Sequence, residues 1–386
     1  IDIGFEGRVA YPLYHRCVTH QYLESKRTSM EIGLIGLPQS GKKTLFELLV
    51  GRDALSKKHD AMKSLRGIAY VKDVRFDALL SIYSPKKHTY ARIDFLLLPK
   101  IDGHNISESN LFDELVEVDA LCHVVRTFHN DAIYHVSGSV NPSRDIDFVN
   151  SELLLHDLIF VEKRMERIDK KLKKIKDEST AAEKTMMEKL LVHLEKEMPL
   201  RLYSLPREEN KVLANYPLLT RKQLVVVLNV SEEQLADSER MRELVERYRE
   251  LQISFVDVAA EAELEIASLE SAEERAVFMK EMGIQRSALH AMTRACIDAL
   301  GLISFFTVSG QELRQWFLRK GSTAVEAAGT IHSDLQRGFI RCEVMNYEDL
   351  VRLGSEDKVK NEGKYYVKGR DYVVQDGDIL YVRFNI

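Results

Sequence analysis

The sequence has few of the features that mark secreted, metal-binding or membrane proteins. Four cysteines occur in 386 residues, and no two of them form a C-x-x-C pair. Their wide spacing argues against a zinc site and a disulfide framework, so reduced thiols and no disulfide partner are expected. No apolar run reaches the length of a membrane span, so we expect no membrane contact and a cytoplasmic location. The cysteines are Cys17, Cys122, Cys296 and Cys342.

The chain also lacks an excess of basic charge. Its net charge is −5 and its pI about 6.2, so any contact with RNA must come from a local patch. A hydrophobic content of 45% over this length is enough for two or three domains with real cores. Residues 1–29 have no long apolar core and precede Met30. We interpret them as a leader or extension outside the fold.

A glycine-containing stretch after the first apolar run has the pattern of a P-loop. Residues 32–35 resemble a strand, and an apolar helical pattern follows Lys42. Between them, Gly36, Gly41 and Lys42 meet the spacing G-x-x-x-x-G-K. In such a loop the backbone N–H groups and a lysine hold phosphates, whereas an ordinary strand-to-helix turn is the alternative for the spacing alone. The predicted phosphate-binding residues are Gln39, Ser40, Gly41, Lys42, Lys43 and Thr44.

The position after Lys42 departs from the P-loop pattern. A Ser or Thr hydroxyl there ligates Mg²⁺, but the residue is Lys43, and Thr44 stands one place late. A cation beside the metal position repels Mg²⁺, although it also replaces part of the metal's charge at the phosphates. We therefore expect a weakened magnesium site.

Buried, strand-like runs alternate with helical patterns along most of the chain. These runs cover residues 90–98, 120–126, 224–230 and 253–258. Such alternation predicts an α/β fold with a parallel sheet covered by helices on both faces. We assign residues 30–150 and 216–302 to this nucleotide-binding domain.

A helical insert interrupts this domain over residues 151–215. Its apolar positions follow heptad spacing, and a second seam covers residues 187–198. Two such helices, joined by a polar turn at residues 177–180, predict an antiparallel coiled-coil hairpin. The lysines within residues 170–176 form either the solvated face of the first helix or an RNA contact. The first seam consists of Leu158, Val161, Met165, Ile168, Leu172 and Ile175.

The last part of the chain has a different character. Short strand-like stretches at residues 304–308, 340–344, 372–374 and 379–384 are separated by turn signals. They predict a small α+β domain over residues 303–386.

The sequence as a whole resembles the Obg-like ATPases, the YchF group of P-loop NTPases. The resemblance rests on DALCHVVR at residues 119–126, on HVSGSVNPSRDIDFVNSELLLHDLIFVEKR at residues 135–164, and on the segment from residue 303 to the end. The last segment, which ends in GRDYVVQDGDILYVRFNI, looks like a TGS domain. That domain is a β-grasp fold that the family shares with threonyl-tRNA synthetases and stringent-response enzymes.

The resemblance implies that the site takes an adenine nucleotide. Ordinary GTPases carry Asn-Lys-x-Asp after a buried strand, and the family carries Asn-x-x-Glu. Asn229, Val230 and Glu232 stand at this point and are the expected base-binding residues, so ATP is preferred over GTP. A turn cap at the end of the strand is the alternative.

Four further positions bear on catalysis. Asp94 matches the Asp of the family's Asp-x-x-Gly and would contact Mg²⁺ through water, but Leu97 replaces the Gly and crowds the phosphate. Ala61 aligns with the second magnesium ligand, a Thr. His123 matches a histidine proposed to swing toward the nucleotide. Its alternative is a half-buried strand residue with one satisfied nitrogen.

These observations predict an ATP-binding regulatory switch, associated with ribosomes or RNA, that hydrolyses ATP slowly with Lys42 and His123 as catalytic residues. It is expected to be a monomer that binds its partner through the TGS domain and the coiled coil. The alternative is a pseudo-ATPase scaffold with little or no hydrolysis, and a GTPase is disfavoured by Glu232. The basic residues expected in the C-terminal part of the partner surface are Arg314, Arg319, Lys320, Arg337 and Arg341.

Overall fold

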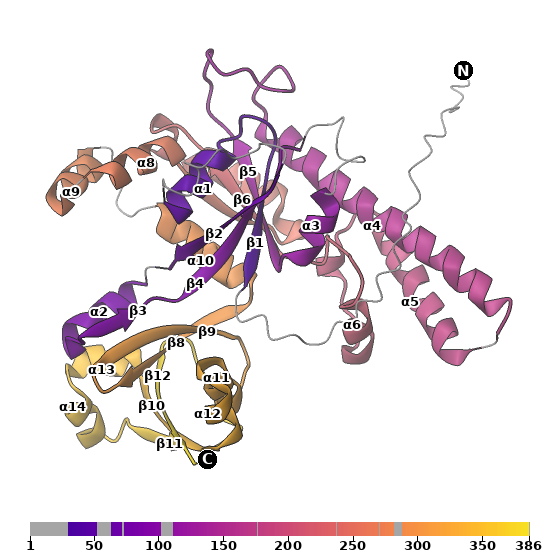
Figure 1. Ribbon diagram of the computed structural model, residues 1–386. Coiled ribbons are helices and arrows are strands. Elements are labelled where there is room, and N and C mark those ends of the chain that lie inside the picture. The colour runs from indigo at the N-terminus through magenta and orange to yellow at the C-terminus, as the bar shows by residue number, and fades with distance from the viewer. Residues whose placement is uncertain are drawn as a thin grey trace, which may run out of the picture.

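A computed structural model of the chain contains two six-stranded sheets and a projecting pair of long helices (Figure 1). The predicted leader at residues 1–29 and Ala61 lie outside the described residues. The described residues are 30–51, 63–71, 73–101, 111–175, 177–236, 238–269, 271–281 and 288–385.

The first sheet has the strand order β2-β4-β1-β5-β6-β7. Its last five strands pair in parallel, and only β2 at one edge runs antiparallel to its neighbour β4. The predicted parallel sheet is therefore confirmed, with one antiparallel edge. Every residue of β1, β5 and β6 is buried, which is why these strands read as continuous apolar runs. The bounds are β1 (Glu31–Ile35), β2 (Leu65–Tyr70), β4 (Arg92–Leu97), β5 (Ala120–Arg126), β6 (Leu224–Asn229) and β7 (Ser254–Val258).

Helices cover both faces of this sheet, as expected. Residues of α1 (Lys42–Val50), α8 (Ala260–Ser268) and α10 (Ala288–Ala299) share one buried cluster with the sheet. Residues of α3 (Leu111–Glu117), α4 (Pro142–Leu172) and α7 (Ser238–Arg247) share the other. Shorter elements are α9 (Ala272–Glu281), η3 (Glu233–Ala236) and η4 (Arg249–Leu251).

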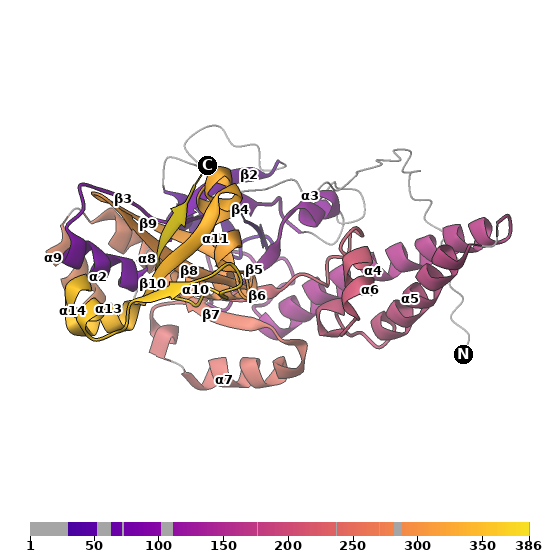
Figure 2. The ribbon, with the colours of Figure 1, turned by 90° about the horizontal axis from the view of Figure 1, so that it is seen from below.

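The long helix α4 and α5 (Glu178–Leu194) form the predicted hairpin, which projects from the sheet (Figure 2). α4 begins at Pro142, before the predicted insert, because its first turns cover the sheet. Ile175 is 63% exposed and does not join the seam, since α4 has already ended. The return path consists of η2 (Leu200–Leu202) and α6 (Arg207–Leu213). The buried Asp157 carboxylate fixes the hairpin's base by accepting bonds from the N–H groups of Leu219 and Thr220, each at 2.8 Å.

The second sheet has the order β11-β10-β12-β8-β9-β3 and includes three of the four predicted C-terminal strands. The predicted strand at residues 372–374 is wrong: only Val373 forms an isolated bridge, because Tyr372 bonds to the first residue of α11 and Val374 to the turn before it. The strands are β3 (Lys87–Thr89), β8 (Leu302–Ser309), β9 (Glu312–Arg319), β10 (Phe339–Asn346), β11 (Tyr366–Lys368) and β12 (Asp378–Phe384). The helices are α2 (Val74–Tyr83), α11 (Ala324–Ile331), α12 (Ser333–Arg337), α13 (Tyr347–Leu353) and α14 (Glu356–Asn361).

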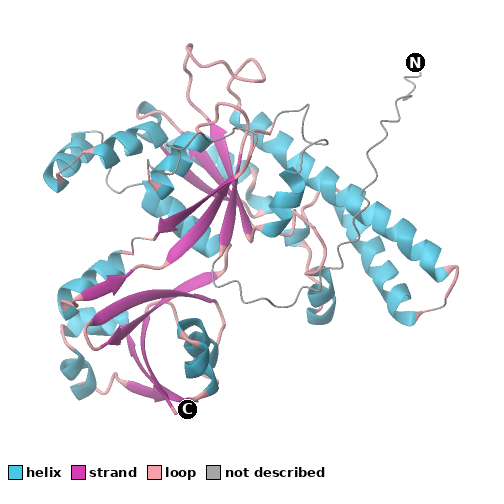
Figure 3. Ribbon diagram, viewed as in Figure 1, coloured by secondary structure: helices cyan, strands magenta, loops and turns pink. Residues whose placement is uncertain are grey.

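Figure 3 shows the strands of the upper unit flanked by helices, whereas the lower unit is a curved sheet with helices around it. Within the part of the chain that the structure describes, no helix is both long and apolar enough to cross a membrane. The described cysteines, Cys122, Cys296 and Cys342, are free and buried.

Candidate functional site

The predicted P-loop connects β1 to α1 at the carboxyl end of the central strand. Gly41 is the N-cap of α1 with φ 89°, a conformation that glycine adopts without strain. A Cβ atom at Gly41 would lie 2.0 Å from Asn229 Nδ2, and one at Gly36 would lie 2.6 Å from the carbonyl oxygen of Val124. Close packing therefore requires glycine at both motif positions. Gln39 also has a positive φ of 61°, which is unusual for a residue with a side chain.

Lys42 is buried inside the loop, with 7% of its surface exposed. Its Nζ donates to the carbonyl oxygen of Pro99 at 2.7 Å and reaches that of Gly36 at 3.5 Å. Burial, and then the charge of Lys43, lower the pKa of Lys42 to about 7. The predicted phosphate-binding lysine is thus held by backbone carbonyls, one of them from the segment after β4.

The side chain of Asn229 connects three parts of the site. Its Nδ2 donates to the carbonyl oxygen of Ser40 at 3.0 Å, and its Oδ1 accepts from the N–H of Ala260 at 3.2 Å. The amide is buried and holds the P-loop against β6 and α8. Of the other predicted base-binding residues, Val230 is buried and Glu232 is exposed.

Gln234, which the sequence did not single out, caps the turn after β6. Its Oε1 accepts from the N–H of Ser231 and from Thr127 Oγ1, each at 3.1 Å. Its Nε2 donates to the carbonyl oxygen of Thr127 at 3.1 Å. The cap thus comes from Gln234, and Asn229 is left to hold the P-loop.

His123 lies in the middle of β5 and is 1% exposed. Neither ring nitrogen has a hydrogen-bond partner among the described residues. Burial, and then the charge of Lys42, lower the pKa of His123 to about 3, so the imidazole is neutral. This environment differs from the half-buried histidine with one satisfied nitrogen that was the alternative.

The sequence associates Asp94 and Lys43 with the predicted magnesium position. Asp94 has a buried Oδ1 without a hydrogen-bond partner among the described residues. Lys43 is exposed, and Thr44 is half-buried. The described residues contain no group of three or more His, Cys, Asp or Glu side chains that would hold a metal ion. No catalytic step is therefore assigned to the metal.

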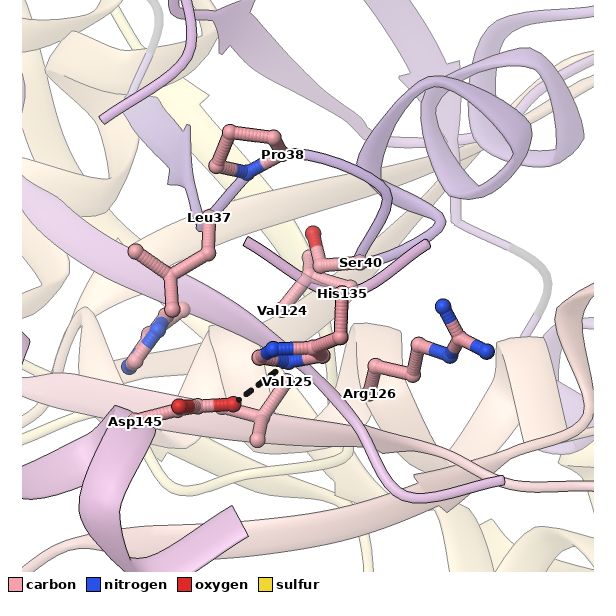
Figure 4. Close-up of a pocket in the computed structure, with 9 residues that line it drawn as sticks. Leu37, Pro38, Ser40, Val124, Val125, Arg126, His135 and Asp145 are labelled. Atoms are coloured by element: carbon pink, nitrogen blue, oxygen red, sulfur yellow. Dashed lines mark hydrogen bonds and ion pairs between the residues drawn. The ribbon is translucent and has the colours of Figure 1, made fainter. Parts of the chain in front are cut away.

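A narrow crevice lies beneath the P-loop (Figure 4). His135 Nε2 and Asp145 Oδ2 are 3.0 Å apart in it, and Arg144 Nη2 donates to the other carboxylate oxygen at 2.8 Å. Ser40 contributes a buried hydroxyl without a partner among the described residues. The sequence assigned no role to His135 and Asp145, although both fall in the stretch that carries the family resemblance. The crevice is lined by Leu37, Pro38, Ser40, His123, Val124, Val125, Arg126, His135 and Asp145.

Comparison with known proteins agrees with this architecture. Residues 302–385 match the family model YchF-GTPase_C, described as a protein of unknown function. The "Ribosome-binding ATPase YchF" of Bacillus subtilis is 39% identical over 367 residues, which cover 93% of this chain and 100% of that protein. The chain belongs to the YchF family. The Haemophilus influenzae YchF of the same description is 35% identical over 363 residues, covering 92% of this chain and 99% of its own.

Solved structures of similar fold extend this result. The Schizosaccharomyces pombe YchF GTPase has a TM-score of 0.79 at 27% identity and covers 92% of this chain and 98% of its own. A GTP-binding protein from Pyrococcus horikoshii, at 22% identity and a TM-score of 0.58, covers 92% and 100% and supports the fold alone. The bacterial YchF proteins are called ATPases and the yeast one a GTPase. These names therefore leave the nucleotide of this chain open.

Proposed function

We propose that this YchF family member binds ATP in preference to GTP, hydrolyses it slowly and acts as a regulatory switch on ribosomes. The observation that carries the proposal is the P-loop itself, where Gly41 caps α1 and Lys42 lies beneath the backbone that would hold phosphates. The descriptions of the bacterial relatives as ribosome-binding ATPases support both the ligand and the partner.

The preference for ATP rests on the turn after β6. Guanine presents N–H donors to the aspartate of an ordinary GTPase, and here Glu232 stands in its place and is exposed. A guanine donor left unpaired in the site loses on the order of 1–3 kcal/mol. Asn229 contributes indirectly, because it holds the P-loop beside this turn.

Slow hydrolysis follows from the groups near the outer phosphate. Water attacks that phosphate, and Lys42 and backbone N–H groups stabilise the charge that develops. Leu97 replaces the glycine whose N–H would approach the phosphate closely, and it is buried. His123 is the candidate for orienting the water. Its two ring nitrogens have no partner among the described residues, and it is able to gain hydrogen bonds by turning toward the nucleotide.

A pseudo-ATPase scaffold is the second candidate function, favoured by the bond between Lys42 and Pro99. To bind Lys42, a phosphate must displace that carbonyl and favour the protonated form of a lysine whose pKa is about 7. Lys43, at the metal-ligand position, weakens Mg²⁺ binding in either case. The chain would then bind its partner without hydrolysing ATP.

The partner surface we propose lies on the coiled-coil hairpin and the C-terminal domain. Among the predicted basic residues, Lys170, Lys171, Arg314 and Arg337 lie within 4.0 Å of carboxylates. The others that are described are exposed and form no ion pair with another described residue. Their charge is therefore available to phosphates, in a cytoplasmic protein that acts as a monomer. They are Lys173, Lys174, Arg319, Lys320 and Arg341.

Two measurements test the proposal. Titration calorimetry with ATP, GTP and ADP, with and without Mg²⁺, should show tighter binding of ATP and only a modest effect of the metal. GTP binding about tenfold tighter than ATP would contradict the nucleotide assignment. Co-sedimentation with ribosomes should weaken steeply with salt, and Lys173→Ala with Lys174→Ala should reduce the salt slope. Arg337→Ala is the matched control, because that arginine is already paired with Asp334.

A further inference from the structure

Residues 73–91 interrupt the nucleotide-binding domain in sequence, yet they pack in the C-terminal domain. β3 pairs in parallel with β9, with Lys87 opposite Glu312 and Thr89 opposite Arg314. Figures 1 and 2 both show α2 and β3 beside β9 and α13, and Figure 1 shows them apart from the first sheet. The C-terminal sheet is therefore completed by a strand that belongs, in sequence, to the nucleotide-binding half.

The apolar face of α2 is part of the C-terminal core. Phe76 and Leu79 are 0% exposed, and the ring centroids of Phe76 and Phe306 are 6.1 Å apart. The burial of two large side chains to this extent holds α2 firmly against the C-terminal domain. Their partners are Phe306, Leu313, Met345, Leu350, Val359 and Ile379.

Polar contacts fix α2 at both ends. At its start, Arg75 donates to both carboxylate oxygens of Asp376, at 2.9 and 3.2 Å. Asp376 also accepts from the N–H of Ser304 at 2.8 Å, so it is itself oriented by β8. At the other end, the hydroxyl of Tyr83 donates to Glu356 of α14 at 2.7 Å.

The same segment leads directly into the nucleotide site. The N–H of Ala91 donates to Oε1 of the buried Gln315 on β9, at 3.3 Å. The next residue begins β4, which carries Asp94. Pro99, which accepts the bond from Lys42, follows soon after β4 ends. The stretch from Ala91 to Pro99 thus contacts the C-terminal domain at one end and the P-loop lysine at the other. Most of it is the paired strand β4, which transmits displacement because its hydrogen bonds to the neighbouring strands resist bending.

We propose that residues 73–91 couple the C-terminal domain to the nucleotide site, with Arg75 and Asp376 as positioning residues. The contacts of the C-terminal domain with α2 and β3 determine the position of β4. The position of β4 in turn determines those of Asp94 and Pro99. The regulatory part of this inference rests on the proposed function, since its two ligands are ATP and a ribosome. A ribosome bound at the C-terminal domain and ATP at the P-loop then change each other's affinity by the same factor.

The first test needs no ligand and uses hydrogen exchange of the full chain. Asp376→Asn removes the charge that holds Arg75 to the C-terminal domain, while the pair of Arg75 with Asp73 stays in place. It also removes the pair of Asp376 with Arg294 of α10, which the second variant, Arg75→Met, leaves intact. Arg75→Met keeps an apolar stem over Phe306. Arg383→Gln is the matched control, because it breaks an equally bidentate pair with Glu343 inside the same domain. Exchange at residues 92–98 should rise by about threefold or more in both test variants and not in the control. Unchanged exchange there overturns the proposal, whether or not α2 exchanges faster.

The second test measures coupling between the two ligands. The affinity of a fluorescent ATP analogue is determined with and without saturating ribosomes. The wild-type ratio should be about fivefold or more, and it should fall toward one in Asp376→Asn but not in Arg383→Gln. A wild-type ratio of one, or an equal ratio in all proteins, overturns the regulatory part. If wild type binds neither ligand, the proposed function fails. The exchange experiment still decides whether residues 73–91 transmit displacement from the C-terminal domain to β4.

Discussion

The Nζ atom of Lys42 donates a hydrogen bond to the carbonyl oxygen of Pro99 at 2.7 Å. The cation that should meet the outer phosphates is therefore occupied by the segment that follows β4. Phosphate must replace this carbonyl, and its negative charge favours the protonated lysine. The ammonium is also the group whose pKa burial has lowered to about 7.

ATP affinity should therefore fall as the pH rises above about 7. The free protein loses the Lys42 proton near its pKa of about 7, whereas a bound phosphate raises that pKa and keeps the proton. Binding is then accompanied by proton uptake, and affinity drops by up to about tenfold per pH unit above that pKa. Calorimetry in buffers of different ionisation enthalpy measures both quantities. An affinity that stays constant across this range, without proton uptake, would contradict the lowered pKa.

Replacing His123 by leucine should stabilise the fold and slow any hydrolysis. Both imidazole nitrogens are buried without a partner among the described residues, which costs about 1–3 kcal/mol for each unsatisfied group. Leucine removes that cost, and it also removes the group proposed to orient water. Urea unfolding and single-turnover assays measure the two effects. His129→Leu is the control, since that histidine is exposed and both properties should stay unchanged. A less stable His123→Leu protein would show that the ring is well satisfied.

Strands buried on both faces were predictable from sequence, and short edge strands were not. The run at residues 120–126 was predicted with the ends that β5 has, because both neighbours in the sheet and both helical layers require apolar residues. β3 has three residues, two of them exposed, and its partner β9 is far along the chain. No local pattern reports such a pairing. As a result, truncation of the chain at residue 302 would expose Phe76 and Leu79, because most of the residues that bury them belong to the C-terminal domain.

The residues of the candidate site were also predictable only where they belong to a local motif, and not where distant contacts bring them together. The glycines and Lys42 were found because a phosphate cradle needs them at fixed spacing. The carbonyl of Pro99 leaves no signature, because every residue has a carbonyl group and only the fold brings this one to Lys42. His135 and Asp145 are ten residues apart on a loop and a helix, and neither type of residue marks a pair by itself.

Gln39→Asn should stabilise the protein by about 1 kcal/mol. Gln39 has φ 61°, in the left-handed region where asparagine is several-fold enriched over residues with longer side chains. Gln252→Asn, at φ 49° and far from the P-loop in sequence, is the matched control. Both variants should resist urea better, but only Gln39→Asn should change ATP affinity, because only its loop is predicted to bind phosphate. No gain in stability from either variant would show that the backbone carries little strain there.

Glu232→Asp should shift the nucleotide preference toward GTP without fully reversing it. The shorter carboxylate is the one that ordinary GTPases use for guanine, and the restored bonds are worth on the order of 1–3 kcal/mol. Competition between ATP and GTP for the site measures the shift. Glu233→Asp makes the same change at the next exposed residue and should leave the preference unchanged. Equal shifts in both variants would mean that residue 232 does not contact the base.

Lys43→Ser should make nucleotide binding more dependent on Mg²⁺. The substitution removes an exposed cation from the ligand position and supplies the hydroxyl that P-loops use for the metal. It also removes the second cause of the lowered pKa of Lys42, so ATP binding without metal should become less sensitive to pH. Affinities with Mg²⁺ and with a chelator, compared between wild type and Lys43→Ser, measure the first effect. Lys86→Ser, which removes another exposed lysine, controls for net charge. Equal Mg²⁺ dependence in wild type and Lys43→Ser would show that Lys43 does not limit metal binding.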